Sequence, residues 1–465
     1  MRRIDPGGHP SAGARRPVLK AHHLTPVPPE RGRWHAPVGS RARFLASVLA
    51  GVTWAGLAAW VSLGWIAELG RWITFPLAAV TIAGVAIVPA CLNAQLLASL
   101  ALDRPRRLRF LHRYPALTLL VATRDDEDRI EETLTYALRS DYPGGLAVLV
   151  ADDGSSDRTR EIARRIASRD RRLHLLELGR AGKPQAQNAA LALVATPLVA
   201  TIEAGTLLMP YALRRAVARL LSSPKGTVAV TGAVLVRNSR ESLLTRIQEW
   251  EYFLGVSSVQ RRQGLLRGSV VAQGALSVHE TAALRRAGGW PERIRPDLAL
   301  RLALLRGGGV TTFEPTAIAF TSAPASLDSF VRQRQRWAQG LVESLRDHGR
   351  ACVGRRGPQR RTIAVTLLSL LFDGAYTLAA LPGIALAAHG SFAIIGPIAA
   401  AVLPVGVTTA LLMLVRQRRE WRRVGLRIRW NPLGFILYLL AYQLLLSPVS
   451  FVGYVREVVR ARRVA

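Results

Sequence analysis

The sequence predicts an α/β domain built on a parallel sheet and joined to α-helical segments that cross a membrane. Two short aliphatic runs, at residues 117–122 and 146–151, have the length and composition of strands that are buried on both faces. Between them Ile130, Leu134 and Leu138 recur at the spacing of one helix face, which predicts a strand–helix–strand unit. On both sides of this region the chain has apolar stretches long enough to cross a bilayer, which takes roughly 20 residues.

The composition favours a membrane protein. The 465 residues are 49% hydrophobic and carry a formal net charge of +32, and the mean hydropathy of +0.18 is high for a soluble enzyme. So large a basic excess suits either nucleic acid or an anionic membrane surface. The arginines flank apolar segments and form no nucleic-acid-binding module, so we expect membrane lipid and no nucleic acid as a partner. Cys91 and Cys352 predict neither a disulfide framework nor a metal cluster.

The N-terminal part predicts a basic arm followed by a membrane hairpin. Residues 1–42 are rich in Pro, Gly, Arg and His and are expected to be disordered. Residues 43–103 form a transmembrane hairpin in which Pro76 and Pro89 are expected to bend the second of two spans, 44–66 and 73–102. Arginines stand on both outer flanks, so the positive-inside rule places the following domain, residues 112–350, in the cytoplasm.

The C-terminal part predicts a second membrane region over residues 361–455 and a basic tail at 456–465, with candidate spans at 363–388, 392–415 and 433–454. Asp373 inside the first of these spans is expected to be a functional or a pairing position. The arginine-rich loop at 416–430 must be cytoplasmic. Three spans would put the basic tail outside the cytoplasm, so the number of spans disagrees with the positive-inside rule. One segment is therefore expected to be re-entrant or interfacial.

Acidic residues follow the second predicted strand. Asp152, Asp153 and Gly154 stand where a strand–helix–strand unit places its loops, at the carboxyl end where open α/β sheets bind ligands. This position predicts a nucleotide site, although Asp-Asp-Gly is also a common turn. Further on, Lys183 opens a helix after a glycine turn. It could place a positive charge beside a diphosphate, helped by free backbone N–H groups, or it could be a solvated turn residue.

The order strand, RDDED, helix, DYP, strand, DDGSSDRT over residues 117–159 resembles the start of the family 2 glycosyltransferases. These are inverting enzymes of GT-A fold with a nucleotide-sugar donor. The resemblance covers roughly residues 40–455. It implies a Rossmann-like, nucleotide-diphospho-sugar transferase domain over residues 112–350. In that domain Asp153, with Asp125, would hold the nucleoside, and Asp152 would also lie on the donor side.

Further matches concern the donor diphosphate. The family commonly has Gly-Lys and then Asn-Ala, here Gly182-Lys183 and Asn188-Ala189. The family then carries Asp-x-Asp, whose carboxylates hold a divalent metal, but this chain has Glu203-Ala204-Gly205. Mg²⁺ can be held by one or two carboxylates together with substrate phosphates. The resemblance therefore implies a divalent metal, Mg or Mn, with Glu203 as a weakened ligand.

The stretch PERIRPDLALRLALLRGGGVTTFEP resembles the family's acceptor-side region, in which Thr-Glu-Asp precedes a helix and a strand ends at Glu-Pro, here Glu314-Pro315. Register counted back from Gly308 and Glu314 puts Asp297 on the position of the general base. Pro296 replaces the family's glutamate and is compatible with the first turn of a helix. The alternative is that Asp297 only caps this helix.

A tryptophan motif follows on the next predicted helix. Gln333, Arg336 and Trp337 reproduce the Gln-x-x-Arg-Trp of membrane-embedded, often processive, members of the family. The resemblance implies that the tryptophan stacks on a sugar while the arginine and glutamine address the diphosphate and the acceptor. Such a helix would also lie well on a bilayer surface.

Together these features imply a multi-pass protein of the bacterial inner membrane, similar to poly-N-acetylglucosamine, cellulose and hyaluronan synthases. We expect transfer of a sugar from a nucleotide-sugar, by resemblance a UDP-sugar, to a growing polysaccharide or lipid-linked acceptor. Two other hypotheses stay open. One is a transferase that adds a single lipid-linked sugar. The other is a catalytically degenerate binding or assembly subunit, suggested by the missing metal carboxylate at Gly205.

Overall fold

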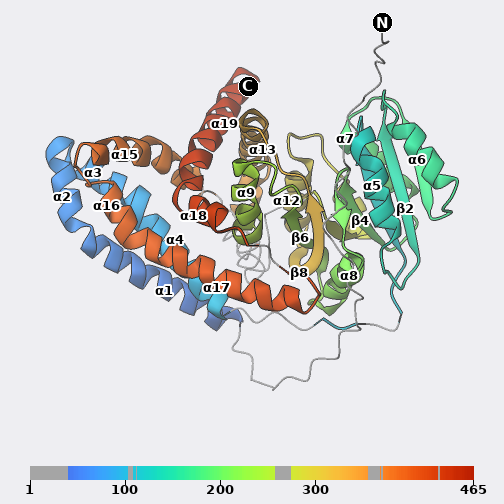
Figure 1. The fold of residues 1–465 in the computed structure, drawn as a ribbon, viewed down its shortest axis with the longest axis horizontal. Coiled ribbons are helices and arrows are strands. Elements are labelled where there is room, and N and C mark those ends of the chain that lie inside the picture. Colours follow the sequence, from blue (N-terminus) through green and yellow to red (C-terminus); the bar gives the residue numbers. More distant parts are fainter. Residues whose placement is uncertain are drawn as a thin grey trace, which may run out of the picture.

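The computed structural model describes residues 40–102, 108–110, 113–256, 274–353, 367, 370–427 and 430–464. Most of the expected N-terminal arm, residues 1–39, therefore lies outside the described residues. The same holds for residues 363–366 and 368–369 of the third expected span. The described residues form an α/β unit beside a group of long helices, as Figure 1 shows.

The α/β unit is built on one mixed sheet of eight strands, in the order β3-β2-β1-β4-β7-β6-β8-β5. The first four are parallel: β1 (Leu117–Thr123), β2 (Leu146–Asp153), β3 (Leu173–Leu178) and β4 (Leu198–Glu203). The others mix directions: β5 (Leu207–Leu208), β6 (Thr227–Val236), β7 (Ser277–Glu280) and β8 (Val310–Thr321). The predicted parallel strands are confirmed, and the second half of the sheet is mixed.

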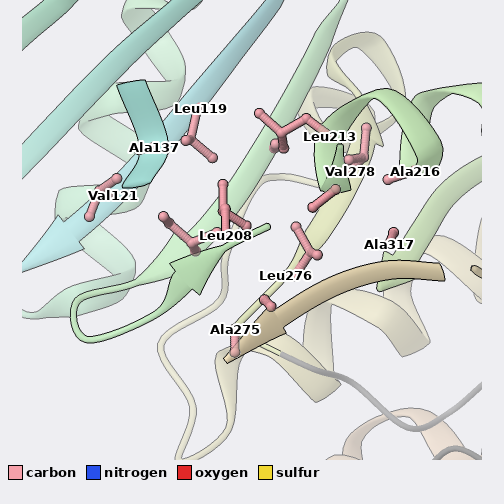
Figure 2. Packing of buried hydrophobic residues seen from close by; sticks show 14 of the residues in the cluster. Leu119, Val121, Ala137, Leu208, Leu213, Ala216, Ala275, Leu276, Val278 and Ala317 are labelled. Carbon is pink, nitrogen blue, oxygen red and sulfur yellow. The ribbon is translucent and has the colours of Figure 1, made fainter. Parts of the chain in front are cut away.

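Both faces of the sheet are covered by helices, which explains the unbroken apolar runs in the sequence. Leu119 and Val121 of β1 pack in one cluster with α5 (Glu127–Leu138), α6 (Thr159–Ala167) and α8 (Ala212–Ser222). Part of this cluster is seen in Figure 2. The alternate residues Leu120 and Ala122 pack instead with α7 (Lys183–Leu193), α11 (Thr281–Arg286) and α12 (Pro296–Arg306). Successive strand residues point to opposite faces, so β1 is apolar at every position except Thr118 and Thr123.

The expectation that a strand ends at Glu314-Pro315 is wrong, because β8 runs on to Thr321. The pairing with β6 jumps at this point, from Gly232–Glu314 to Ala233–Ile318. Pro315 has no N–H to donate, so the ladder is interrupted there and resumes beyond it. The Glu314 carboxylate turns inward and accepts a hydrogen bond of 2.6 Å from Arg219 Nε.

Among the described residues, four helical stretches are long and apolar enough to cross a membrane: Ala42–Val61, Phe75–Leu102, Leu370–Ala388 and Ile395–Arg422. Large apolar side chains point away from the protein along the first, including Leu45, Leu49 and Trp60. A fifth candidate is the pair α18 (Pro432–Leu440) and α19 (Tyr442–Val464), which is bent by 53° and is therefore a broken span or a re-entrant loop.

The prolines of the second span act differently from each other. Pro76 lies in the first turn of α3 (Phe75–Ile82), where its missing N–H costs no helix bond, so the expected bend at this residue is wrong. Pro89 follows directly on a π-helical turn, Ala83–Ile87, at the start of α4 (Val88–Leu102). A π turn before a proline is a usual way for a helix to absorb the missing hydrogen bond.

The long helices are tied to the α/β unit by buried polar contacts. The segment expected to be a loop from residue 416 is in fact helical as far as Arg422, as the end of α17 (Leu403–Arg422). Trp421 near that end is buried and donates from its indole to the Pro315 carbonyl at 2.9 Å. Trp250 of α9 (Leu243–Trp250) donates to the carbonyl of Asn431, whose side chain caps α18. The next helix, α19, lies along α13 (Leu327–Val353), as Figure 1 shows.

Asp373 is a pairing position within the described helices. Its Oδ1 accepts hydrogen bonds from Gln443 Nε2 at 3.0 Å and from Ser447 Oγ at 2.8 Å. Its Oδ2 accepts one from the Tyr454 hydroxyl at 2.8 Å. All three donors lie on α19, so the acid fastens that helix to the third apolar span.

Candidate active site

The acidic residues predicted from the sequence meet at one edge of the sheet. The strands β1, β2 and β4 are parallel neighbours and end together, with Thr123 opposite Asp152 and Ala122 opposite Glu203. The ends of three strands thus bring together side chains from positions up to 80 residues apart, as the topology predicted.

Two of the predicted nucleotide residues have partners inside the protein. Asp152 is buried and accepts from Arg160 Nη2 at 2.6 Å and from the hydroxyl of Ser155. Asp153 is also buried and accepts from the backbone N–H groups of Ala181 and Gly182, at 2.8 and 2.7 Å. Asp152 therefore fixes its own turn, and Asp153 fixes the loop that leads into α7.

Asp125 presents its carboxylate to solvent. It has a φ of +52°, in the left-handed region that Asp tolerates better than most residues. The Ser156 backbone N–H donates to its Oδ1 at 2.8 Å, and this hydrogen bond lowers the pKa of Asp125. Its side chain is 47% exposed. Of the three predicted aspartates, it is the one with a carboxylate exposed at the rim.

Lys183 and Glu203 form an ion pair at the centre of this edge. Lys183 is the first residue of α7, after Gly182, whose φ of +103° is accessible mainly to glycine. Its Nζ lies 2.6 Å from Glu203 Oε1. Burial opposes the charged ammonium, but Glu203 and, beyond it, Asp297 outweigh this effect and raise the pKa of Lys183. A permanent cation therefore lies between the end of β4 and the start of α12.

Asp297 lies inside the first turn of α12, and Arg295 holds the cap position, so Asp297 is not the cap residue itself. Its Oδ2 lies 2.9 Å from Arg295 Nη2. Burial opposes ionisation of Asp297 and would raise its pKa. The positive charges of Arg295 and Lys183 together act more strongly in the other direction, so the pKa of Asp297 is held below its ordinary value. The group is a carboxylate at neutral pH and can accept a proton, as a general base must.

The tryptophan motif lies beside this pair, on α13. Arg336 is exposed and close enough to Lys183 to act on its charge. Gln333 Oε1 is buried and has no hydrogen-bond partner within the described part of the chain, which leaves it available to a ligand. Trp337 is half-buried, and the guanidinium carbon of Arg295 lies 5.4 Å from its ring centroid. The helix thus brings Trp337 beside Arg295, and Arg336 within electrostatic reach of Lys183.

The residues present do not fit a metal held by the protein alone. Within the described ranges, no group of three or more His, Cys, Asp or Glu side chains could hold a metal ion. Glu203 is already engaged by Lys183. The family's second carboxylate is replaced by Gly205, with a φ of +86°, where an added Cβ would lie 3.1 Å from Arg129 Cδ. A cation here would meet one carboxylate and would compete for it with an ammonium group.

Two arginines of this site were missed by the sequence analysis. Arg295 pairs with Asp297, and its only signal was its position two residues before the expected base. Arg301 is buried one turn further along α12, and burial lowers its pKa to about 10. From sequence alone, an arginine in a leucine-rich helix is assigned to the exposed polar face. Periodicity does not show that another element covers that face, so the burial of Arg301 could not be predicted.

Residues 115–340 match the protein-family model described as "Glycosyltransferase like family 2". An N-acetylglucosaminyltransferase from Mesorhizobium japonicum is 26% identical over 238 residues, which are 49% of this chain and 56% of that protein. A poly-beta-1,6-N-acetyl-D-glucosamine synthase from Staphylococcus epidermidis is 29% identical over 231 residues, 49% of this chain and 55% of that protein. This chain therefore spans just over half the length of these curated relatives.

Among solved structures, the mannosyltransferase PcManGT from Pyrobaculum calidifontis, in complex with GDP-Man and Mn²⁺, superposes with a TM-score of 0.55. The two are 21% identical, and the similarity covers 90% of this chain and 99% of that one. At that identity the likeness concerns the fold. The GT-A fold is thus compatible with a divalent metal, whatever this chain's own residues supply. The described strands, the matched segment and this fold agree: residues 115–340 match the family 2 glycosyltransferase model and have the GT-A fold, beside helices that could span a membrane.

Proposed function

We propose that this chain is an inverting glycosyltransferase that moves a sugar from a nucleotide-sugar onto an acceptor hydroxyl. The observation that carries the proposal is the pairing of two charges at the carboxyl edge of the sheet. A permanent cation, Lys183, opens α7, and an ionised carboxylate, Asp297, opens α12 within electrostatic reach of it. A cation suits the departing diphosphate, and a carboxylate suits the attacking hydroxyl.

On the donor side, the exposed Asp125 hydrogen-bonds the nucleoside. Asp153 contributes by holding the loop at residues 181–182, which sets the free N–H groups at the start of α7 toward the diphosphate. Lys183 and Arg336 then take up the negative charge that grows on the diphosphate. Both curated relatives are named for N-acetylglucosamine, which supports UDP-N-acetylglucosamine as the first donor to test.

On the acceptor side, Asp297 removes the proton of the hydroxyl as its oxygen attacks the anomeric carbon. The new carbon–oxygen bond forms on the face opposite the departing diphosphate, whose bond to that carbon breaks with its electron pair, so the configuration inverts. Gln333 offers a hydrogen-bond acceptor to the sugar hydroxyls. A polysaccharide end or a lipid-linked sugar is the acceptor that suits a domain standing next to apolar helices.

Because the protein supplies one carboxylate and Lys183 already engages it, the protein alone would hold a divalent metal weakly. We propose that Mg²⁺ or Mn²⁺, where it takes part, arrives mainly on the phosphates of the donor, with Glu203 as its protein ligand. This contrasts with a site in which the protein binds the cation before the substrate does.

We propose four spans, with the glycosyltransferase domain on the cytoplasmic side of the bacterial inner membrane. The bent pair α18 and α19 then lies at the membrane surface against the domain. Its contacts with α13 support this place: Arg456 Nη1 donates to Gln335 Oε1 at 2.6 Å, and Arg346 lies 3.6 Å from Glu457. Four spans return the basic tail to the side of the domain, which removes the conflict between the span count and the positive-inside rule.

A second candidate function is a nucleotide-binding assembly subunit without transferase activity. Gly205 and the engaged Glu203 are the observations that favour it. Such a subunit would still bind the nucleotide through the donor-side loops but would not transfer the sugar.

Nucleotide release from the purified full-length protein in lipid nanodiscs distinguishes the two candidates. With UDP-N-acetylglucosamine and a β-1,6-linked acceptor oligosaccharide, the wild type should release UDP. Asp297→Asn should lower the rate by about 100-fold or more while UDP affinity changes little, because the amide cannot accept the proton. Nucleotide binding without release from any donor would favour the assembly subunit. Full activity of Asp297→Asn would remove Asp297 from its role as base.

A further inference from the structure

Arg295 stands at the cap of α12, directly beside the proposed base. It occupies the position where the family pattern has threonine, so this arginine is a departure of this chain. The ion pair that it forms with Asp297 is well covered, with side-chain exposures of 19% and 28%. Charges in such a place are screened little by salt, so their geometry matters more than that of a surface pair.

The stem of Arg295 packs on the bare backbone of α13 at Gly340. A Cβ added at Gly340 would lie 2.4 Å from Arg295 Cγ and 2.9 Å from its Cβ, closer than real carbon contacts. Any side chain at residue 340 would therefore displace the arginine. The glycine is a site of close approach between α12 and α13, and the occupant of the space is Arg295.

Trp337, one turn before Gly340, meets the head of the same arginine. The Arg295 guanidinium carbon lies 5.4 Å from the ring centroid, and that of Arg334 lies 4.3 Å from it. Arg334 is itself buried and held by Glu251, 2.5 Å away. Both distances are within the range of cation–π attraction. The indole ring therefore already has two cationic partners within the chain.

We propose that Arg295 is a positioning residue for Asp297, and that Trp337 is the bracket that holds Arg295 in place. The tryptophan of the motif then acts on the base through an arginine. This inference rests on the proposed role of Asp297 as general base.

The pairing with Arg295 gives the base two properties. One carboxylate oxygen is pinned by the guanidinium, which fixes the direction of the other, and the group stays ionised although it is mostly buried. The other charged side chains that act on Asp297 electrostatically are Lys183 of α7 and Arg301 of α12. Among the groups that act on Asp297, Arg295 has the largest stabilising effect on its charge.

The first test compares Arg295→Met with Arg293→Met. Arg293 lies two residues earlier, is half-exposed and pairs with Asp347 at 2.6 Å, so it is a matched loss of one arginine. In Arg295→Met, Asp297 loses the positive charge that opposes the effect of burial, so its pKa should rise. The acid limb of the kcat/KM profile for UDP release should therefore move to higher pH. The maximal rate should fall by about 100-fold, because the base is misplaced. Arg295→Lys should return the acid limb toward that of the wild type, and Arg293→Met should match the wild type.

The second test changes the bracket and keeps every charge. Trp337→Ala and Gly340→Ala should both move the acid limb in the same direction as Arg295→Met, with the acceptor KM within about twofold. Trp337→Phe, which keeps an aromatic face, should lie closer to the wild type. UDP affinity and thermal unfolding, measured on each variant, identify any that fail to fold.

Two results would overturn the inference. An unchanged acid limb in a folded Arg295→Met would leave the arginine a structural residue. A raised acceptor KM with an unchanged acid limb in Trp337→Ala would make the tryptophan a sugar platform. In both cases Asp297→Asn would still be inactive, so the proposed base would stand. If Asp297→Asn is active, Asp297 is not the general base. The proposed mechanism is then wrong, and so are the roles of Arg295 and Trp337 that depend on it.

Discussion

At the scale of single residues, the pair Lys183–Glu203 decides how the site meets a diphosphate. Both side chains are nearly half exposed, at 45% and 43%, so water screens the pair and it contributes about 1 kcal/mol or less. A substrate that brings its own negative charge can therefore take Lys183 from Glu203 at little cost. The Lys183 ammonium thus exchanges Glu203 for the donor diphosphate when the donor binds.

Lys183→Met should separate the two partners. Loss of the ammonium should weaken the binding of UDP by about tenfold, because a charge-assisted contact to phosphate is lost. The same change frees Glu203, so the nucleotide-free protein should bind Mn²⁺ more tightly than the wild type. Calorimetric titrations of UDP and of Mn²⁺ measure both effects. An unchanged Mn²⁺ affinity would show that Glu203 is not a metal ligand.

Gly205→Asp should not restore the family's metal site by itself. The φ of +86° strains any residue with a Cβ, and Arg129 Cδ lies 3.1 Å from where that atom would be. We expect a destabilisation of about 1–2 kcal/mol in thermal unfolding. In the double variant with Arg129→Ala the new carboxylate has room, and the Mn²⁺ concentration for half-maximal UDP release should fall below that of the wild type. If the single variant is as stable as the wild type, the backbone at residue 205 adapts more easily than its conformation indicates.

At the scale of elements, β7 shows the limit of pattern reading. Its four residues, Ser277–Glu280, have no apolar run, and their strand conformation comes from antiparallel pairing with both β4 and β6. By contrast β1 and β2 were predictable because full burial demands continuous apolar sequence. The site followed the same division. Asp297 was predicted by register with the family pattern, whereas the contact of Arg295 with Trp337 joins residues 42 positions apart, and no local spacing encodes it.

The central place of β7 also predicts an acid sensitivity. His279 on this strand is buried, and burial lowers its pKa to about 3 from an ordinary value of 6.5. Between these values the unfolded chain binds a proton that the folded chain does not. The free energy of unfolding should therefore fall as the pH drops through this window, by up to about 1.4 kcal/mol per pH unit.

His279→Leu removes this titration. Urea unfolding followed at pH 6.5, 5.5 and 4.5 should show a shallower loss of stability with falling pH than in the wild type. His174, which is exposed on β3, offers the control: His174→Leu should keep the wild-type slope. Equal slopes for all three proteins would mean that His279 is protonated in the folded state.

At the scale of the whole molecule, the arrangement of spans is testable at two places. With four spans, a reporter that is active only in the periplasm should be active when inserted at residues 389–391, between the third and fourth spans, and inactive when fused after residue 465. If the bent pair α18 and α19 crosses the bilayer as a fifth span, the C-terminal fusion becomes active and the insertion result does not change. An inactive reporter at residues 389–391 would mean that the connection between the third and fourth spans does not lie in the periplasm.

Trp421 has a consequence for the order in which the protein can be completed. It is fully buried beside Phe313 and Ile318 of β8, so part of the core of the α/β unit comes from the end of the fourth apolar span. A ribosome makes residues 115–340 long before residue 421, at about 5–20 residues per second. We therefore expect this side of the core of the α/β unit to close only after residue 421 has been made. A chain truncated before residue 421 should therefore leave Phe313 and Ile318 uncovered on that side of the α/β unit.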